Sequence, residues 1–276
     1  MQIKTILALT DLEEDSLTGL RGAFRIASET GARVVVGHVL VPRTLDPSNV
    51  KEFLEKHGFD PSSVTIDIEI DADVHSGIDL LVEESSPDLV VISSKRKRGF
   101  MRLLWASVPV GLVGHCKAPV LALHTGKDHF NFKRAVVCVD GSPGSQILVD
   151  DAHKLVGADG DLVGLMVIED SPMVVGGIDI GSYSKEVLDK ARVAGEKFVK
   201  NLRVKRSDLT LKSDVRVGDA VEEILKTIER HDADLVVVGT GGIGGEARFY
   251  VSKVCEQVTR YANVATLVVP TDRPES

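Results

Sequence analysis

The chain has 276 residues, of which 43% are hydrophobic and 27% charged, and its 33 basic and 41 acidic side chains give a formal net charge of −8. This composition supports buried cores and excludes wholesale disorder, and the acidic balance argues against a general nucleic-acid coat protein. At roughly 150 residues per domain, the length predicts about two domains.

The amino-terminal sequence MQIKTILALTDLEED turns acidic after a short apolar run and has no small-residue cleavage site, so we expect no signal peptide. No apolar run approaches the roughly 20 residues that span a bilayer. The three cysteines, Cys116, Cys138 and Cys255, are scattered and odd in number, which is typical of reduced thiols. These features predict a cytoplasmic protein without a membrane span.

Apolar runs alternate with amphipathic stretches along the whole chain. The runs are nearly continuous in Val, Ile and Leu, which is typical of strands buried on both faces of a parallel sheet. Between them, residues 17–28 and 187–202 place apolar side chains at helical spacing; in the second stretch these are Val187, Ala191, Ala194, Phe198 and Leu202. The predicted strands are residues 3–9, 33–40, 64–70, 88–93, 119–123, 132–139, 161–168, 210–217, 234–239 and 265–269.

The pattern of one half repeats in the other. An apolar run ends in Asp11 in IKTILALTD and in Asp140 in FKRAVVCVD, and DLVVIS at residues 88–93 matches DLVVVG at residues 234–239. Agreement at separate anchors predicts two copies of one α/β domain, at residues 1–126 and 131–276. Alternating strands and helices imply a doubly wound, five-stranded parallel sheet in each copy, similar to a Rossmann fold.

Ligands of open parallel sheets bind beyond the carboxyl ends of the strands, where the strand order reverses. In the second copy the loops at that place contain Asp140-Gly141-Ser142 and the glycine-rich residues 239–245. Bare backbone amides in such a loop, with a helix N-terminus behind them, favour an anion. Residues 239–244 also satisfy G-x-G-x-x-G, but too little chain follows for a dinucleotide-binding unit, and no Walker motif is present.

Both halves resemble the universal stress protein family, and the whole chain resembles its tandem members. ATP-binding members carry G-x-x-G, nine residues and then G-[ST] after strand four, with an aspartate at the end of strand one. Here Gly239 and Gly242 match the first pair, and the later pair falls on Ser252 and Lys253. The resemblance implies ATP with Mg²⁺ in the second domain. The residues implied are Asp140 and Val167 at the base, Gly218 at the sugar, and Gly239, Gly242, Ser252 and Lys253 at the phosphates.

Each of these residues has a plainer interpretation. Asp140 suits a helix-capping carboxylate, a role that is compatible with ligand binding. The loop at residues 239–245 suits a flexible entry into the next helix, and Lys253 suits a solvent-facing side chain. Ser252 offers a hydroxyl and its backbone N–H to a phosphate.

The first half departs from the motif, which we therefore describe as degenerate there. The residues after Asp11 are Leu-Glu-Glu-Asp and add negative charge where phosphates would lie. Where the second half has glycines, the first has Ser93, Arg96 and Ala72. We therefore expect about one nucleotide per chain.

The consecutive basic residues Lys95, Arg96, Lys97 and Arg98 form the most pronounced cluster of positive charge in the sequence. A solvated loop before a core-facing helix explains them, and a patch for an acidic partner is the functional alternative. Nucleic acid is disfavoured, since one basic loop is a thin platform.

The sequence predicts a stress-response regulatory protein that binds an adenine nucleotide without efficient chemistry. The alternatives are a partner-binding protein without nucleotide, and a slow ATPase or autophosphorylating protein. We find no catalytic motif and no spacing typical of metal ligands. Pairing of two chains as a homodimer stays open.

Overall fold

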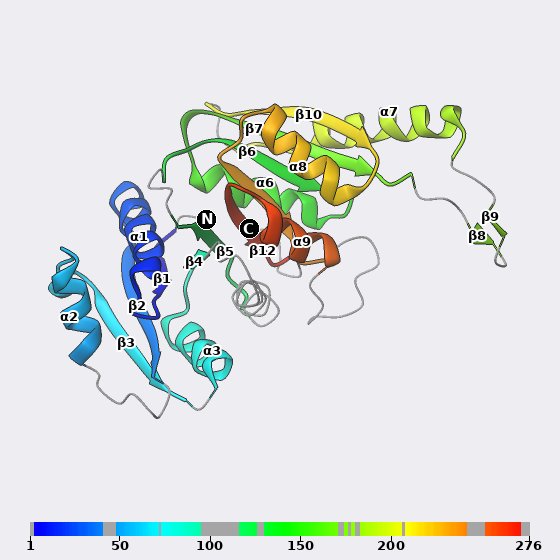
Figure 1. Ribbon diagram of the computed structural model, residues 1–276. Helices are drawn as coiled ribbons and strands as arrows, with labels where there is room; N and C mark the ends of the chain where they lie inside the picture. The colour runs from blue at the N-terminus through cyan, green and yellow to red at the C-terminus, as the bar shows by residue number, and fades with distance from the viewer. Residues whose placement is uncertain are drawn as a thin grey trace. The chain divides into compact units, whose positions relative to one another are not determined.

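The computed structural model describes residues 3–40, 48–71, 73–94, 116–125, 130–170, 174–175, 178–179, 183–205, 208–241 and 252–271, and the statements below concern these residues. The chain divides into two compact units, residues 1–130 and 131–276 (Figure 1). None of the helices in the described ranges combines the length and apolar character that crossing a bilayer would require.

The first unit contains a parallel sheet in the order β5-β4-β1-β2-β3. The order in which the strands are added to the sheet reverses between β1 and β4, which are parallel neighbours. Its strands are β1 (Thr5–Leu9), β2 (Arg33–Leu40), β3 (Thr65–Ile70), β4 (Leu89–Ser94) and β5 (Val120–His124). Its α-helices are α1 (Leu17–Thr30), α2 (Ser48–Lys56) and α3 (Val74–Ser85), and short 3-10 turns cover Glu14–Ser16 and Pro61–Ser63.

The second unit repeats this order as β10-β7-β6-β11-β12, again with all neighbours parallel. Its strands are β6 (Phe132–Val139), β7 (Val156–Ile168), β10 (Thr210–Val217), β11 (Leu235–Gly239) and β12 (Ala265–Val269). Its helices are α6 (Gly144–Leu155), α7 (Lys185–Asn201), α8 (Ala220–Arg230) and α9 (Lys253–Tyr261). The short strands β8 (Val174–Val175) and β9 (Ile178–Asp179) pair antiparallel within the insert before α7.

Right-handed crossovers put α6 and α7 on one face of the second sheet and α8 and α9 on the other. α6, α7 and α8 all pack on β7, and α8 also packs against α9. Figure 1 shows α8 and α6 on opposite sides of the strands. The sheet interiors are apolar, and Leu235, Val236 and Val237 of β11 are completely buried. The predicted fold class is therefore confirmed, and the strands start and end within two residues of prediction except that β7 begins early, at Val156.

Two aspartates of each repeat make the same backbone hydrogen bonds in both units. Asp88 accepts hydrogen bonds from the amides of Lys4 and Thr5, and Asp234 accepts them from Lys133 and Arg134, so each carboxylate joins the starts of two adjacent strands. Asp73 and Asp219 cap the helices α3 and α8 by accepting from the amide three residues on. The aspartates at equivalent positions of the repeat thus fix the backbone in the same way in both units.

The orientation of α7 differs from the prediction. The periodicity placed Val187 and Ala194 on the core face, but Val187 is 47% exposed and Ala194 is exposed as well. The buried residues of α7 are instead Gly195 and Val199. A Cβ on Gly195 would lie 2.9 Å from the sulfur of Met166, so a glycine allows this helix to approach β7 closely. The close approach, rather than the apolar spacing, decides which face of α7 is buried.

Candidate functional site

A cavity of about 470 Å³ lies in the second unit at the carboxyl ends of β6, β7 and β11. This is the place where the strand order reverses, and the volume is in the range of small-molecule sites. Its walls also include the beginnings of α6, α8 and α9. The described residues that line it are Cys138, Val139, Asp140, Ser142, Gly144, Ser145, Leu148, Leu165, Val167, Glu169, Ala220, Ile224, Val238, Gly239, Gly241, Ser252, Val254, Cys255 and Thr271.

The structure brings four of the predicted site residues together in this cavity: Asp140, Val167, Gly239 and Ser252. They come from three strand ends and one helix start that are far apart in the sequence. Gly218 and Lys253 are not among its lining residues, although Gly218 precedes Asp219, the N-cap of α8, and Lys253 is the first residue of α9. Gly242 lies outside the described residues.

Asp140 organises the turn between β6 and α6. Its Oδ1 accepts hydrogen bonds from the Ser142 amide at 3.0 Å, the Ser142 hydroxyl at 2.7 Å and the Ser145 hydroxyl at 3.1 Å. A carboxylate that accepts from the amide two residues on forms an Asx turn rather than a helix cap. The next residue, Gly141, has a φ of +89°, which glycine adopts without strain. The turn is therefore held before any ligand arrives.

Gly218 ends the crossing from β10 to α8 with a φ of +151°. Its amide donates to the carbonyl of Ile168 at 3.0 Å, which fixes the turn to the end of β7. A Cβ at this position would lie 3.2 Å from Cγ of Glu223. The glycine thus allows the chain to turn beside the cavity.

Ser252 is the N-cap of α9, and its hydroxyl accepts from the Cys255 amide at 3.2 Å. The backbone N–H that the sequence suggested for a phosphate is already used, because it donates to the carbonyl of Thr240 at 2.9 Å. The expectation that Ser252 offers both its hydroxyl and its backbone N–H to a phosphate is therefore wrong for the N–H. The hydroxyl hydrogen can still donate to a ligand, whereas the N–H already donates to Thr240. Helix geometry leaves the amides of Lys253 and Val254 without intrahelical acceptors.

Lys253 begins α9 with an exposed side chain. Among the described residues that line the cavity there is no lysine, arginine or histidine, whereas Asp140 and Glu169 contribute two carboxylates. The rim that the structure describes is therefore acidic.

The floor of the cavity is apolar. Leu148, Leu165, Val167 and Val238 line it together with the thiols of Cys138 and Cys255. Burial raises the pKa of Cys255 to about 12 and also raises the pKa of Cys138, so both thiols are neutral near pH 7. A flat apolar face, such as that of an aromatic base, suits such a floor.

Sequence reasoning missed Glu169, Ser145 and Thr271 as parts of the site. Ser145 follows Asp140 by five residues and carried a local signal, since serines are common in such turns. Glu169 lies at the end of β7, one place beyond the predicted strand. Thr271 follows the last strand and carried no local signal, because its neighbours in the cavity come from distant segments.

The corresponding place in the first unit is built differently. Ser93, which occupies the position of Gly239, accepts a 2.7 Å hydrogen bond from the Gly19 amide through its hydroxyl. Leu12 occupies the position of Gly141 and keeps its left-handed backbone, with a φ of +59°. Glu13 donates its amide to Asp11, as Ser142 does to Asp140. The departures at Ala72 and Arg96 lie outside the described residues, as do the other basic residues of 95–98.

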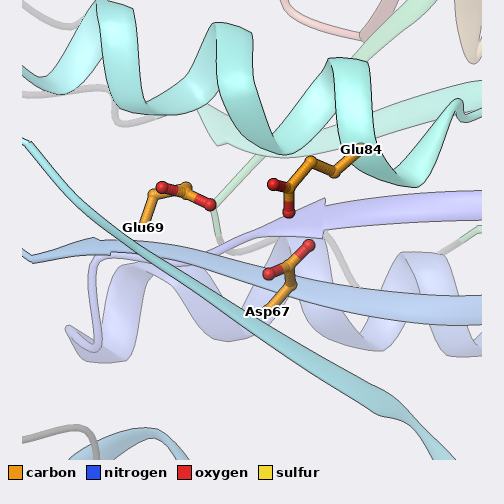
Figure 2. A group of neighbouring side chains, drawn as sticks. All are labelled: Asp67, Glu69 and Glu84. Atoms are coloured by element: carbon orange, nitrogen blue, oxygen red, sulfur yellow. The ribbon is translucent and has the colours of Figure 1, made fainter.

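A group of three carboxylates gathers elsewhere in the first unit. Asp67 and Glu69 on β3 and Glu84 on α3 have side-chain oxygens within 4.8 Å of one another. Figure 2 shows the three carboxylates pointing toward one another between the strand and the helix. Burial, with the charges of Glu84 and Asp67, raises the pKa of Glu69. The period-two spacing of Asp67 and Glu69 was a signal that the sequence reasoning did not use.

Comparison with known proteins gives a consistent result. The family model described as "Universal stress protein family" matches the chain twice, at residues 2–124 and 131–270. A universal stress protein of Mycolicibacterium smegmatis is 27% identical over 195 residues, which is 69% of this chain and 64% of that protein.

One solved structure agrees in fold over nearly the whole chain. It is that of a universal stress protein from Pseudomonas aeruginosa UCBPP-PA14 and covers 97% of this chain and 93% of its own, with a TM-score of 0.65 and 17% identity. A universal stress protein solved in complex with cAMP covers 46% of this chain and all of its own, with a TM-score of 0.37 and 17% identity.

Proposed function

The chain belongs to the universal stress protein family, and on that premise we propose that its second unit binds an adenine nucleotide, with ATP as the first ligand to test. The observation that supports this most is the meeting of Asp140, Val167, Gly239 and Ser252 in one cavity. Residues from four segments line a single space of nucleoside size at the switch point of the sheet.

The walls of the cavity divide by chemistry in the way that a nucleotide divides. The apolar floor at Val167 and Leu165 suits a base, and the start of α9 suits an anion, because Val254 lines the cavity and the helix dipole is positive there. The hydroxyls of Ser142 and Ser252 suit the sugar and the first phosphate. The function we infer is regulatory binding, since no histidine or lysine that could serve as a general base lines the described walls.

Mg²⁺ fits the donor set of this cavity. Carboxylate oxygens are the ligands that Mg²⁺ takes from proteins, usually one or two of them beside the phosphates of a substrate. Asp140 and Glu169 would hold it there. The ion would supply charge that offsets the phosphates.

Equilibrium dialysis of the full chain against labelled ATP with Mg²⁺ tests the proposal. We expect one nucleotide per chain. Val167→Phe should abolish binding by filling the cavity, while Val193→Phe, on the exposed side of α7, should leave it unchanged. Circular dichroism of both variants establishes that they fold.

Two outcomes would contradict the proposal. One is the absence of binding at millimolar nucleotide, which would favour a partner-binding protein. The other is undiminished binding by a folded Val167→Phe variant, which would move the site away from this cavity.

A further inference from the structure

Thr271 fills the space that the glycines of this site leave. A Cβ on Gly239 would lie 2.8 Å from Cγ2 of Thr271, and a Cβ on Gly144 would lie 2.9 Å from its Cβ. A Cβ on Gly241 would lie 3.2 Å from its Oγ1. The bare backbone at these three glycines therefore faces the Thr271 side chain. A phosphate that approached it closely would have to displace that side chain.

The amides in this part of the cavity wall already have acceptors. Thr240 donates to the carbonyl of Val269 at 3.0 Å, and Gly241 donates to Oγ1 of Thr271 at 3.3 Å. The Ser252 amide donates to the carbonyl of Thr240 at 2.9 Å. An anion here would exchange existing hydrogen bonds for new ones, which yields little net free energy. Of the amides along this wall, those at the start of α9 have no intrahelical acceptor, and they suffice for one phosphate.

The charge of the cavity rim also disfavours the binding of phosphates. Asp140 and Glu169 line the cavity as carboxylates, and no cationic side chain does so among the residues that the structure describes. At about 8 Å in water, one pair of like charges weakens binding roughly twofold. With the two outer phosphates of ATP near the two carboxylates, the combined effect would be on the order of tenfold.

We propose that this cavity selects adenine ligands by the space and the charge of their phosphates, and that it binds adenosine and AMP more tightly than ATP. Thr271 and Glu169 are the residues that set this preference: the first occupies the place of the outer phosphates, and the second repels them. The inference rests on the proposed function, because it concerns the same cavity and the same class of ligand.

Titration calorimetry of the full chain with adenosine, AMP and ATP, each with and without Mg²⁺, tests the preference. We expect Kd values for adenosine and AMP about tenfold below that for ATP without Mg²⁺, and a smaller difference with it. Without Mg²⁺, Thr271→Ala and Glu169→Gln should each tighten ATP binding by at least twofold, and the adenosine-to-ATP affinity ratio should fall in both variants.

Matched controls are available in the first unit. Thr125→Ala changes the position that corresponds to Thr271, and Glu55→Gln removes one exposed carboxylate from α2. Neither should change any of the three affinities. Glu169 is exposed, so Glu169→Gln keeps the test valid even where Thr271→Ala weakens the fold.

The failures are distinguishable. Tighter binding of ATP than of adenosine without Mg²⁺, or an unchanged ratio of the two affinities in both variants, would overturn the charge preference alone. Absence of binding for all three ligands would overturn the proposed function and this preference with it.

Discussion

The hydroxyl of Ser93 accepts a 2.7 Å hydrogen bond from the amide of Gly19, across the contact between β4 and α1. In the second unit the corresponding positions hold Gly239 and Leu148. There the larger side chain belongs to the helix, and a Cβ on Gly239 would lie 3.4 Å from Cδ1 of Leu148. In the first unit the strand carries the larger residue of this contact and the helix the smaller one, and in the second unit the reverse is true. The exchange places a side chain in the first unit where the second leaves backbone bare.

Ser93→Ala should lower the free energy of unfolding of the first unit by about 1 kcal/mol, because it removes the acceptor of an amide in the first turn of α1. Urea unfolding measures this. Ser94→Ala, one residue further along β4, is the control and should have a smaller effect. Equal losses for the two variants would show that the hydrogen bond from Gly19 contributes nothing of its own.

Gly239→Ala should destabilise the second unit by about 1–3 kcal/mol, since the new methyl group meets Cγ2 of Thr271. Thr271→Ser removes that methyl group and keeps the oxygen that accepts from Gly241. The double variant should therefore recover more than half of the loss. Thermal unfolding of the four proteins completes a double-mutant cycle. Strictly additive losses would contradict the contact.

Gly141→Ala should lower stability by about 1 kcal/mol, because a side chain at a φ of +89° is strained. Leu12→Gly tests the same turn in the first unit, where a φ of +59° already strains a leucine. Relief of that strain offsets the flexibility that glycine adds to the unfolded chain, so stability should not fall. A loss of 1 kcal/mol or more for Leu12→Gly would show that its side chain packs usefully.

Asp214 accepts a hydrogen bond from Nη2 of Arg216 at 3.0 Å and lies 3.0 Å from Nε2 of His231. Burial alone would raise the pKa of Asp214, but the hydrogen bonds from Arg216 and His231 outweigh it and hold the pKa below its usual range. Asp214→Asn should therefore lower the free energy of unfolding at pH 7 by about 1–3 kcal/mol.

The pH dependence of that loss follows from the sign of the shift. A carboxyl whose folded pKa is lowered contributes stability above its unfolded pKa of about 4, and the contribution disappears as pH falls through the folded value. Urea midpoints of the wild type and Asp214→Asn should converge below pH 4. Asp189→Asn, at an exposed position of α7, is the control. A constant difference from pH 3 to pH 7 would refute the linkage.

Glu69→Gln should stabilise the first unit at pH 7 by up to about 0.5 kcal/mol. The pKa of Glu69 is raised, so its ionised form is disfavoured in the folded state, and protonation on acidification relieves the same cost. The part of the gain that comes from burial should persist in 1 M salt, while the part that comes from the charges of Glu84 and Asp67 should be lost because salt screens them. Glu55→Gln is the matched control. A gain that salt leaves unchanged would show that the neighbouring charges contribute nothing.

The sequence alone determined the two-fold repeat, the ten strands of the parallel sheets and the strand ends at which the cavity lies. Continuous Val, Ile and Leu runs mark strands buried on both faces, and the paired aspartates Asp88 and Asp234 mark equivalent strand starts. Asp140 follows from the end of a predicted strand, whereas Val167 was implied by the resemblance to the universal stress protein family.

The tertiary structure alone decided which groups of the cavity are free to bind. Nothing near Ser252 in the sequence shows that its amide donates to Thr240, or that Thr271 faces Gly239 and Gly241. The buried face of α7 was decided in the same way, by the approach of Gly195 to Met166. The physical reason is that apolar periodicity acts over neighbouring residues, whereas the partner of a backbone amide and the contents of a cavity depend on segments that only the fold brings together.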